Sequence, residues 1–112
     1  MNYEEITAMI DAIGIPAAYY QFTQETAKPP PFICFFFTRR ADFYADNVNY
    51  AHIEELSIEL YTDNKDFDLE GKLEATLEAH NLTYTVEETY LDSESMYMRT
   101  YVTEVMINEQ QN

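Results

Sequence analysis

The sequence lacks several features that define common protein classes. Its 112 residues contain no tryptophan, two glycines, one cysteine and only six lysine and arginine residues. Two glycines are too few for a glycine-rich loop that holds nucleotide phosphates, and one cysteine, Cys34, cannot form an internal disulfide. No run approaches the roughly 20 apolar residues of a membrane span, and the first residues lack the pattern of a signal peptide. We therefore expect a cytosolic protein that does not bind membranes.

Positive charge is the scarcest property of the chain. Aspartate and glutamate number 21 against six lysine and arginine residues, which gives a net charge of −15. Such a surface repels phosphates, so sequence-specific binding of nucleic acid is not expected. Three functional interpretations remain open: a solubility device, a mimic of nucleic-acid charge, and the lining of a channel through which DNA slides. A solvated acidic surface without a further role is the simplest alternative.

Catalytic and metal-binding patterns are missing as well. No nucleophile is paired with a base at a recognised spacing, and His52 has no second histidine or cysteine at metal-ligand spacing. The acidic residues Asp63, Asp66 and Asp68 lack the glycine and the terminal glutamate of a calcium loop. We therefore expect no enzyme activity, no catalytic residue, no cofactor and no metal.

The hydrophobic pattern predicts an α+β fold. With 46% hydrophobic residues, the chain is long enough for one domain, residues 1–108, followed by a flexible polar tail, residues 109–112. Its apolar periodicities predict the order α-β-β-β-α-β-β. We expect an antiparallel-rich sheet with both helices packed on one face. The expected elements are residues 3–13, 17–22, 32–38, 50–62, 67–80, 82–91 and 95–107.

Several local signals refine this prediction. Asn2 begins a capping pair for the first helix, and Gly14 is suited to a left-handed position at its end. Gly71, inside the second helix, is unfavourable for helix formation and suggests the close approach of a neighbouring element. Ile53 is out of phase with the alternation downstream of it, which predicts a bulge or bend at residues 54–55.

The stretch from Pro29 to Asn47 dominates the sequence. After three prolines, Phe32–Thr38 predicts a strand that is apolar on both faces, with Cys34 as a small buried side chain. Two helices on one side of a sheet leave the other side uncovered. In a chain this short, the second face of the strand therefore suggests a partner subunit.

A polar segment, residues 39–49, follows this strand and is longer than a tight hairpin requires. Its adjacent arginines and aromatic residues are typical of interface patches. A long β-hairpin whose aromatic side chains pack back on the sheet is an equal alternative. The residues expected to contact a subunit or partner are Arg39, Arg40, Asp42, Phe43, Tyr44, Asp46 and Asn47.

Five segments in order carry a family resemblance. They are AIGIPAAYYQF (12–22), PPFICFFF (30–37), DFYADN (42–47), IELYTDNKDFDLE (58–70) and SESMYMRTYVTEV (93–105). On these segments the chain resembles the tail completion proteins of siphophages and prophages of Gram-positive bacteria, a group that includes tail terminator and head–tail joining proteins.

This resemblance implies a structural subunit of the virion. It would assemble in the host cytoplasm as a homo-oligomeric ring, typically a hexamer, at the head–tail junction. There it would cap or complete the tail tube, contact other tail or connector proteins, and let DNA pass along acidic walls. The alternative is a monomeric acidic protein that mimics DNA and inhibits a DNA-binding defence protein of the host.

Overall fold

The computed structural model describes residues 1–45 and 48–108, so the predicted tail at 109–112 lies outside the described residues. The element order is the predicted α-β-β-β-α-β-β, which confirms an α+β fold. The elements are α1 (Tyr3–Asp11), β1 (Ala17–Tyr19), β2 (Phe32–Ala45), β3 (Val48–Thr62), α2 (Phe67–Ala79), β4 (Tyr84–Leu91) and β5 (Met96–Ile107).

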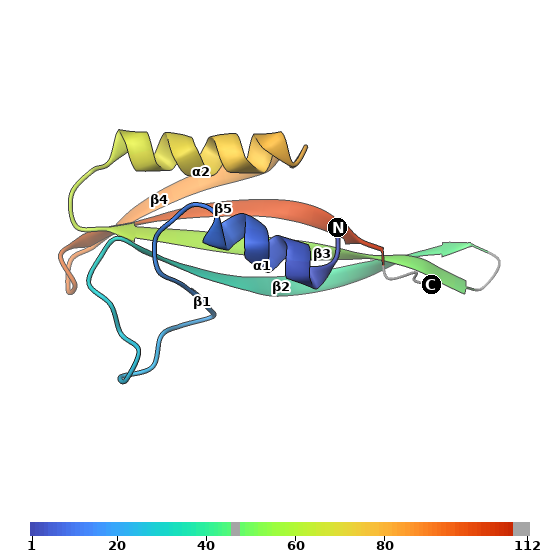
Figure 1. Cartoon of the computed structure of the whole chain (residues 1–112), viewed down its shortest axis with the longest axis horizontal. Helices are drawn as coiled ribbons and strands as arrows, with labels where there is room; N and C mark the ends of the chain where they lie inside the picture. Colours follow the sequence, from blue (N-terminus) through green and yellow to red (C-terminus); the bar gives the residue numbers. More distant parts are fainter. Residues whose placement is uncertain (46–47, 109–112) are drawn as a thin grey trace.

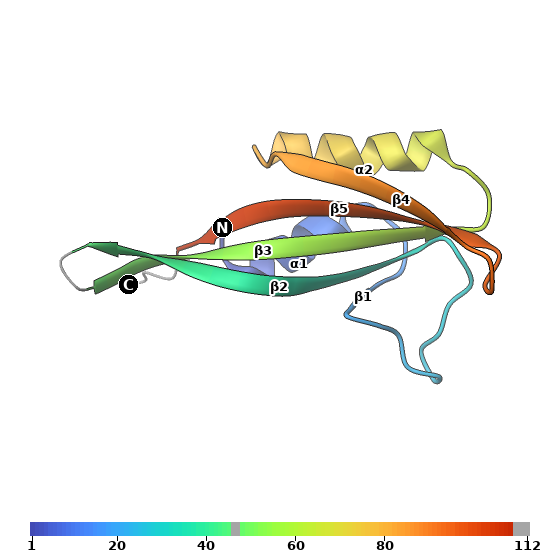
Figure 2. The ribbon, with the colours of Figure 1, turned by 180° about the vertical axis from the view of Figure 1, so that it is seen from behind.

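All five strands form one sheet in the order β1-β2-β3-β5-β4. The short strand β1 runs parallel to β2, and every other neighbouring pair is antiparallel. Both helices lie on the same side of this sheet (Figure 1), and the view from behind shows a sheet face that carries no helix (Figure 2). We call these the helix-covered face and the helix-free face.

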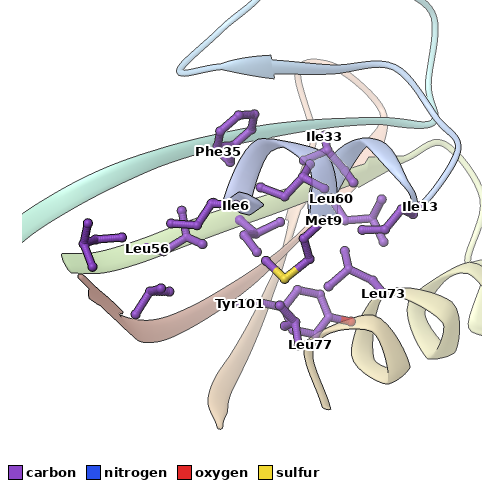
Figure 3. Packing of buried hydrophobic residues seen from close by; sticks show 14 residues of the cluster. Ile6, Met9, Ile13, Ile33, Phe35, Leu56, Leu60, Leu73, Leu77 and Tyr101 are labelled. Carbon is purple, nitrogen blue, oxygen red and sulfur yellow. The ribbon is translucent and has the colours of Figure 1, made fainter. Parts of the chain in front are cut away.

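The hydrophobic core fills the space between the helices and the helix-covered face (Figure 3). Because side chains alternate along a strand, every second residue of β2, β3 and β5 points into this layer. Each of these core residues is at most 6% exposed. They are Ile6, Met9, Ile10, Ile13, Ile33, Phe35, Leu56, Ile58, Leu60, Leu73, Leu77, Tyr101, Val105 and Ile107.

The predicted helix ends are formed by local hydrogen bonds. Asn2 and Glu5 make a reciprocal capping box, in which both backbone-to-side-chain bonds measure 2.8 Å. Gly14 has φ +95°, as expected for a left-handed residue after α1. After α2, Asn81 has φ 61°, and the N–H of Leu82 donates to the carbonyl of Leu77 at 3.0 Å. These bonds satisfy groups that a helix end leaves without partners.

An ion network attaches α2 to strands β4 and β5. Lys65, just before α2, pairs with Glu70 of the helix and with Glu88 of β4. Arg99 of β5 lies 3.2 Å from Glu88 and 3.3 Å from Glu74 of α2. Because the side chain of Glu70 is only 7% exposed, its charge depends on these two cations.

The structure decides between the two alternatives predicted for residues 39–49. Residues 39–45 continue the strand β2 and pair with β3, so the region is the long hairpin and not a loop. Opposite charges favour this pairing, since Arg39 lies across from Glu55 and Arg40 across from Glu54. Local sequence could not decide between the alternatives, because the partners lie about 15 residues away along the chain.

The bulge predicted at residues 54–55 of β3 is wrong, since β3 pairs with β5 there without interruption. A bulge lies instead in the neighbouring strand β2, between Phe37 and Arg39 and opposite Glu55. The hydroxyl of Thr38 donates to Oε1 of Glu55 at 2.6 Å, which holds the bulged residue in place. Ile53 is out of phase with the core because the second face of β3 also carries apolar residues.

The two glycines give a matched test of the backbone. A Cβ added at Gly71 meets no atom within 4 Å, so the predicted close approach is wrong. We therefore expect Gly71→Ala to raise the free energy of unfolding by about 0.5–1 kcal/mol. Gly14→Ala should lower it by about 1 kcal/mol, because alanine is strained at positive φ. Urea unfolding followed by circular dichroism measures both, and a stabilised Gly14→Ala would contradict this account.

The ion network predicts a dependence of stability on pH. The hydrogen bond from Lys65, with help from Arg99, lowers the pKa of Glu88 below its ordinary value of 4.5. A lowered folded-state pKa stabilises the fold above the unfolded pKa, and this contribution disappears as the pH falls through the folded pKa. When the pH falls below 4.5, the free energy of unfolding of Glu88→Gln should therefore decrease less than that of the wild type.

The neighbouring variant Glu87→Gln is the control for this experiment. Glu87 points to the opposite face of β4 and has no ion pair among the described residues. Its pH dependence should therefore follow that of the wild type in urea titrations at several pH values. Equal acid sensitivity of Glu88→Gln and the wild type would refute the proposed role of the network.

Candidate functional site

A two-stranded arm extends from the body of the molecule. The last β5 residue in the ladder, Ile107, pairs with His52, so within residues 1–45 and 48–108 the segments 43–45 and 48–51 pair only with each other. The arm projects along the long axis, on which the molecule measures 51 Å (Figure 1). On the outer side of β2, the parallel strand β1 pairs with Ile33–Phe35, and no other described strand pairs with that edge. Of the residues that the sequence predicted at an interface, Phe43 and Tyr44 belong to this arm, and Arg39, Arg40 and Asp42 precede it in β2.

The root of the arm, residues 39–42 of β2 and 52–55 of β3, carries a charged cluster on the helix-covered side of the sheet. Nε of Arg40 lies 2.9 Å from Asp42, and Nδ1 of His52 lies 3.0 Å from the same carboxylate. Desolvation acts to raise the pKa of Asp42, but the hydrogen bond from His52 and the ion pair with Arg40 outweigh it and lower the pKa. Beside this cluster, the hydroxyl of Tyr3 donates to the buried carboxylate of Glu54 at 2.6 Å.

The two adjacent arginines point to opposite faces. In the ladder Arg40 lies opposite Glu54, and both side chains are on the helix-covered side. Arg39 lies opposite Glu55 on the helix-free side. Arg39 is exposed and, within the described part of the chain, has no ion pair. The structure therefore brings Arg40 together with Asp42, and separates both from Arg39.

For the other predicted interface residues, the structure gives the backbone position of two, Phe43 and Tyr44. Phe43 and Tyr44 belong to β2, and their partners across the ladder are Ala51 and Asn49. Asp46 and Asn47 lie outside the described residues.

The helix-free face is the second unusual surface. Its apolar side chains are half-buried or exposed, and Met106 reaches 54% exposure. Single exposed apolar residues are common, but a series of them across four strands is typical of an interaction surface. The apolar residues that alternate onto this face are Phe32, Phe36, Ile53, Tyr61, Leu91, Met96, Met98, Val102 and Met106.

Part of this face is covered by the chain itself. Tyr20 packs edge-on against Phe36 with ring centroids 5.7 Å apart, and Phe22 packs likewise against Phe32 at 5.4 Å. Phe32 also stacks on Tyr61 at 4.8 Å. The segment before the prolines therefore shields the start of β2, a role that the sequence prediction did not assign to it.

A groove of about 950 Å³ lies at this end of the helix-free face. Its walls are the segment around Tyr20–Lys28, the start of β2, the end of β3 and the turn between β4 and β5. Aromatic and sulfur-containing side chains line it together with Glu59, Glu94 and Lys28. Sequence reasoning missed this groove because four segments that are distant in the sequence build it. The only sequence signal was the pair of aromatic residues, Tyr20 and Phe22, in an otherwise polar connection.

Two groups in the groove have a raised pKa, the hydroxyl of Tyr61 and the thiol of Cys34. The hydroxyl of Tyr61 donates to Glu59 at 2.7 Å, and desolvation together with this bond raises the pKa of Tyr61. Burial, and then the charge of Glu59, raise the pKa of the Cys34 thiol. Cys34 is 5% exposed, in agreement with the predicted small buried side chain. Its raised pKa makes it a poor nucleophile.

Residues 1–45 and 48–108 contain neither a cluster of metal ligands nor a membrane-spanning helix. No group of three or more potential metal ligands comes together within these ranges. Neither of the helices there combines the length and apolar character needed to cross a membrane. Comparison of the chain with protein-family models finds no match, and comparison with curated proteins finds none either.

The reactivity of Cys34 tests the geometry of the groove. We expect iodoacetamide at mildly alkaline pH to modify Cys34 at least about tenfold more slowly than free glutathione, because the thiol is buried and protonated. Glu59→Gln should speed the reaction by removing the charge that raises the pKa of the thiol. Mass spectrometry follows the modification, and unfolded protein is the control. A Cys34 as reactive in the folded as in the unfolded chain would refute this description.

Proposed function

We propose that this protein is a structural subunit of a phage virion that assembles as a ring at the head–tail junction and lets DNA pass. The helix-free sheet face carries the proposal. A domain of this size with so much apolar surface on one side is well suited to a neighbouring subunit. The segmental resemblance to tail completion proteins supports the same role, and the α+β fold is compatible with it.

The charge distribution supports passage of DNA through such a ring. A net charge of −15 leaves many carboxylates on the surface, which would repel the phosphates of DNA in a central channel. Repulsion keeps the polymer from binding to the wall, so that it can slide. In the proposed ring, the arm and its root contact a neighbouring subunit or the tail tube. The proposed partners are copies of this chain and other tail or connector proteins.

The mass of the protein in solution tests this function. We expect native mass spectrometry and light scattering to detect a closed oligomer, formed either by the protein alone or on isolated tail tubes. Negative-stain electron microscopy should then show rings with a channel wide enough for duplex DNA. A protein that stays monomeric under both conditions, and that competes with DNA for a basic host protein, would overturn the ring proposal in favour of the DNA mimic.

A shortened arm provides the matched variant. Replacing residues 43–51 by Asn-Gly joins Asp42 to His52, which already face each other, through a two-residue turn. The core lies outside this segment, so circular dichroism and the unfolding midpoint should change little. Ring formation should be lost. A shortened variant that assembles like the wild type would show that the arm makes no required contact.

A further inference from the structure

The arm and the groove lie at opposite ends of the long axis. The arm follows Asp42 and His52, whereas the groove is bounded by the turn between β4 and β5 and by the segment before β2. In Figure 2 these two regions occupy opposite ends of the ribbon. A projecting arm at one end and a groove at the other allow a head-to-tail contact, in which the arm of one copy enters the groove of the next. Such contacts join two different patches and form rings when the rotation closes.

The groove has an excess of negative charge. It contains two carboxylates, Glu59 and Glu94, and one ammonium group, Lys28. The root of the arm carries Arg39 and Arg40 among the carboxylates Asp42, Glu54 and Glu55, so only its individual cations, and not its net charge, can complement the groove. In a subunit of net charge −15, copies repel one another at long range, and a cation at their contact offsets part of this repulsion.

The guanidinium group of Arg40 can bind a carboxylate of a second subunit while it stays bound to Asp42. Two of its nitrogens, Nε and Nη2, donate to Asp42 and fix the orientation of the guanidinium group. The group has five N–H donors, so those on Nη1 remain for a second carboxylate. The side chain is 47% exposed, which leaves room for that carboxylate to approach.

The orientation of copies in a ring favours Arg40, and not Arg39, as the arginine that faces the neighbouring groove. Neighbours in a ring of six are related by a rotation of about 60°, so their sheets face roughly the same way. An arm placed on the helix-free face of a neighbour then presents its own helix-covered side, where Arg40 lies. A twofold dimer would instead bring two helix-free faces together and present Arg39.

We propose that the arm of each copy lies in the groove of the next copy, where Arg40 contacts Glu59 and Glu94. This inference rests on the proposed ring and identifies its contact. The groove volume of about 950 Å³ can hold several large side chains, and the sequence places Phe43 and Tyr44 just beyond Arg40. Aromatic walls suit both an aromatic side chain and a guanidinium group.

Charge reversal on the two sides of the contact tests the proposal. Arg40→Glu and Glu59→Arg should each abolish rings when studied alone. Their equimolar mixture should restore them, because an alternating ring places opposite charges at every contact. Native mass spectrometry of the mixture should show rings with equal numbers of the two variants. Restoration also separates a lost contact from a folding defect, which mixing cannot repair.

Arg39→Glu is the matched control, since it makes the same charge change one residue away on the opposite face. It should form rings like the wild type. In wild-type rings the arm should also cover Cys34, so that iodoacetamide modifies the assembled protein more slowly than the shortened-arm variant. If Arg39→Glu alone abolished assembly, or if Glu59→Arg still formed rings, the proposed contact would be overturned while the ring itself could stand. A wild type that never assembles would overturn the ring as well.

Discussion

The packing of both helices on one face of a sheet that is apolar on both faces is the constraint on which this structure depends. Ile58, at the centre of β3, is fully covered by the helical layer. The neighbouring strand β5 presents Met98 and Val102 on the other side, where no helix covers them. Apolar burial on one side stabilises the monomer, and apolar exposure on the other side favours association. The same sheet therefore provides both the core and the apolar surface that the proposed association would use.

Charge acts in the opposite direction to the apolar face. The excess of carboxylates makes identical copies repel each other, which would make the proposed contacts between them sensitive to salt. Two of the six lysine and arginine residues, Lys65 and Arg99, bind carboxylates within the chain and hold α2. Arg39 and Arg40 are therefore among the few cations left for the proposed contact.

Much of the fold could be predicted from the sequence because its signals are local. Caps such as Asn2, left-handed residues such as Gly14 and the alternation in β3 involve residues within a few positions of one another. The long hairpin remained one of two alternatives, because polar residues 39–45 become a strand only through pairing with β3. The candidate site could be predicted only in part, since the sequence indicated the arginines but not their opposite faces. The groove required the tertiary structure to bring its four segments together.

The bulge at Thr38 has a consequence for the size of an assembly. A bulge increases the local twist of a strand pair and bends it, so this one extra residue helps to set the direction in which the arm leaves the body. In a closed assembly, the angle between adjacent copies determines how many copies complete the circle, and hence the diameter of the opening. In the proposed ring, the hydrogen bond from the hydroxyl of Thr38 to the carboxylate of Glu55 would thus contribute to the number of copies.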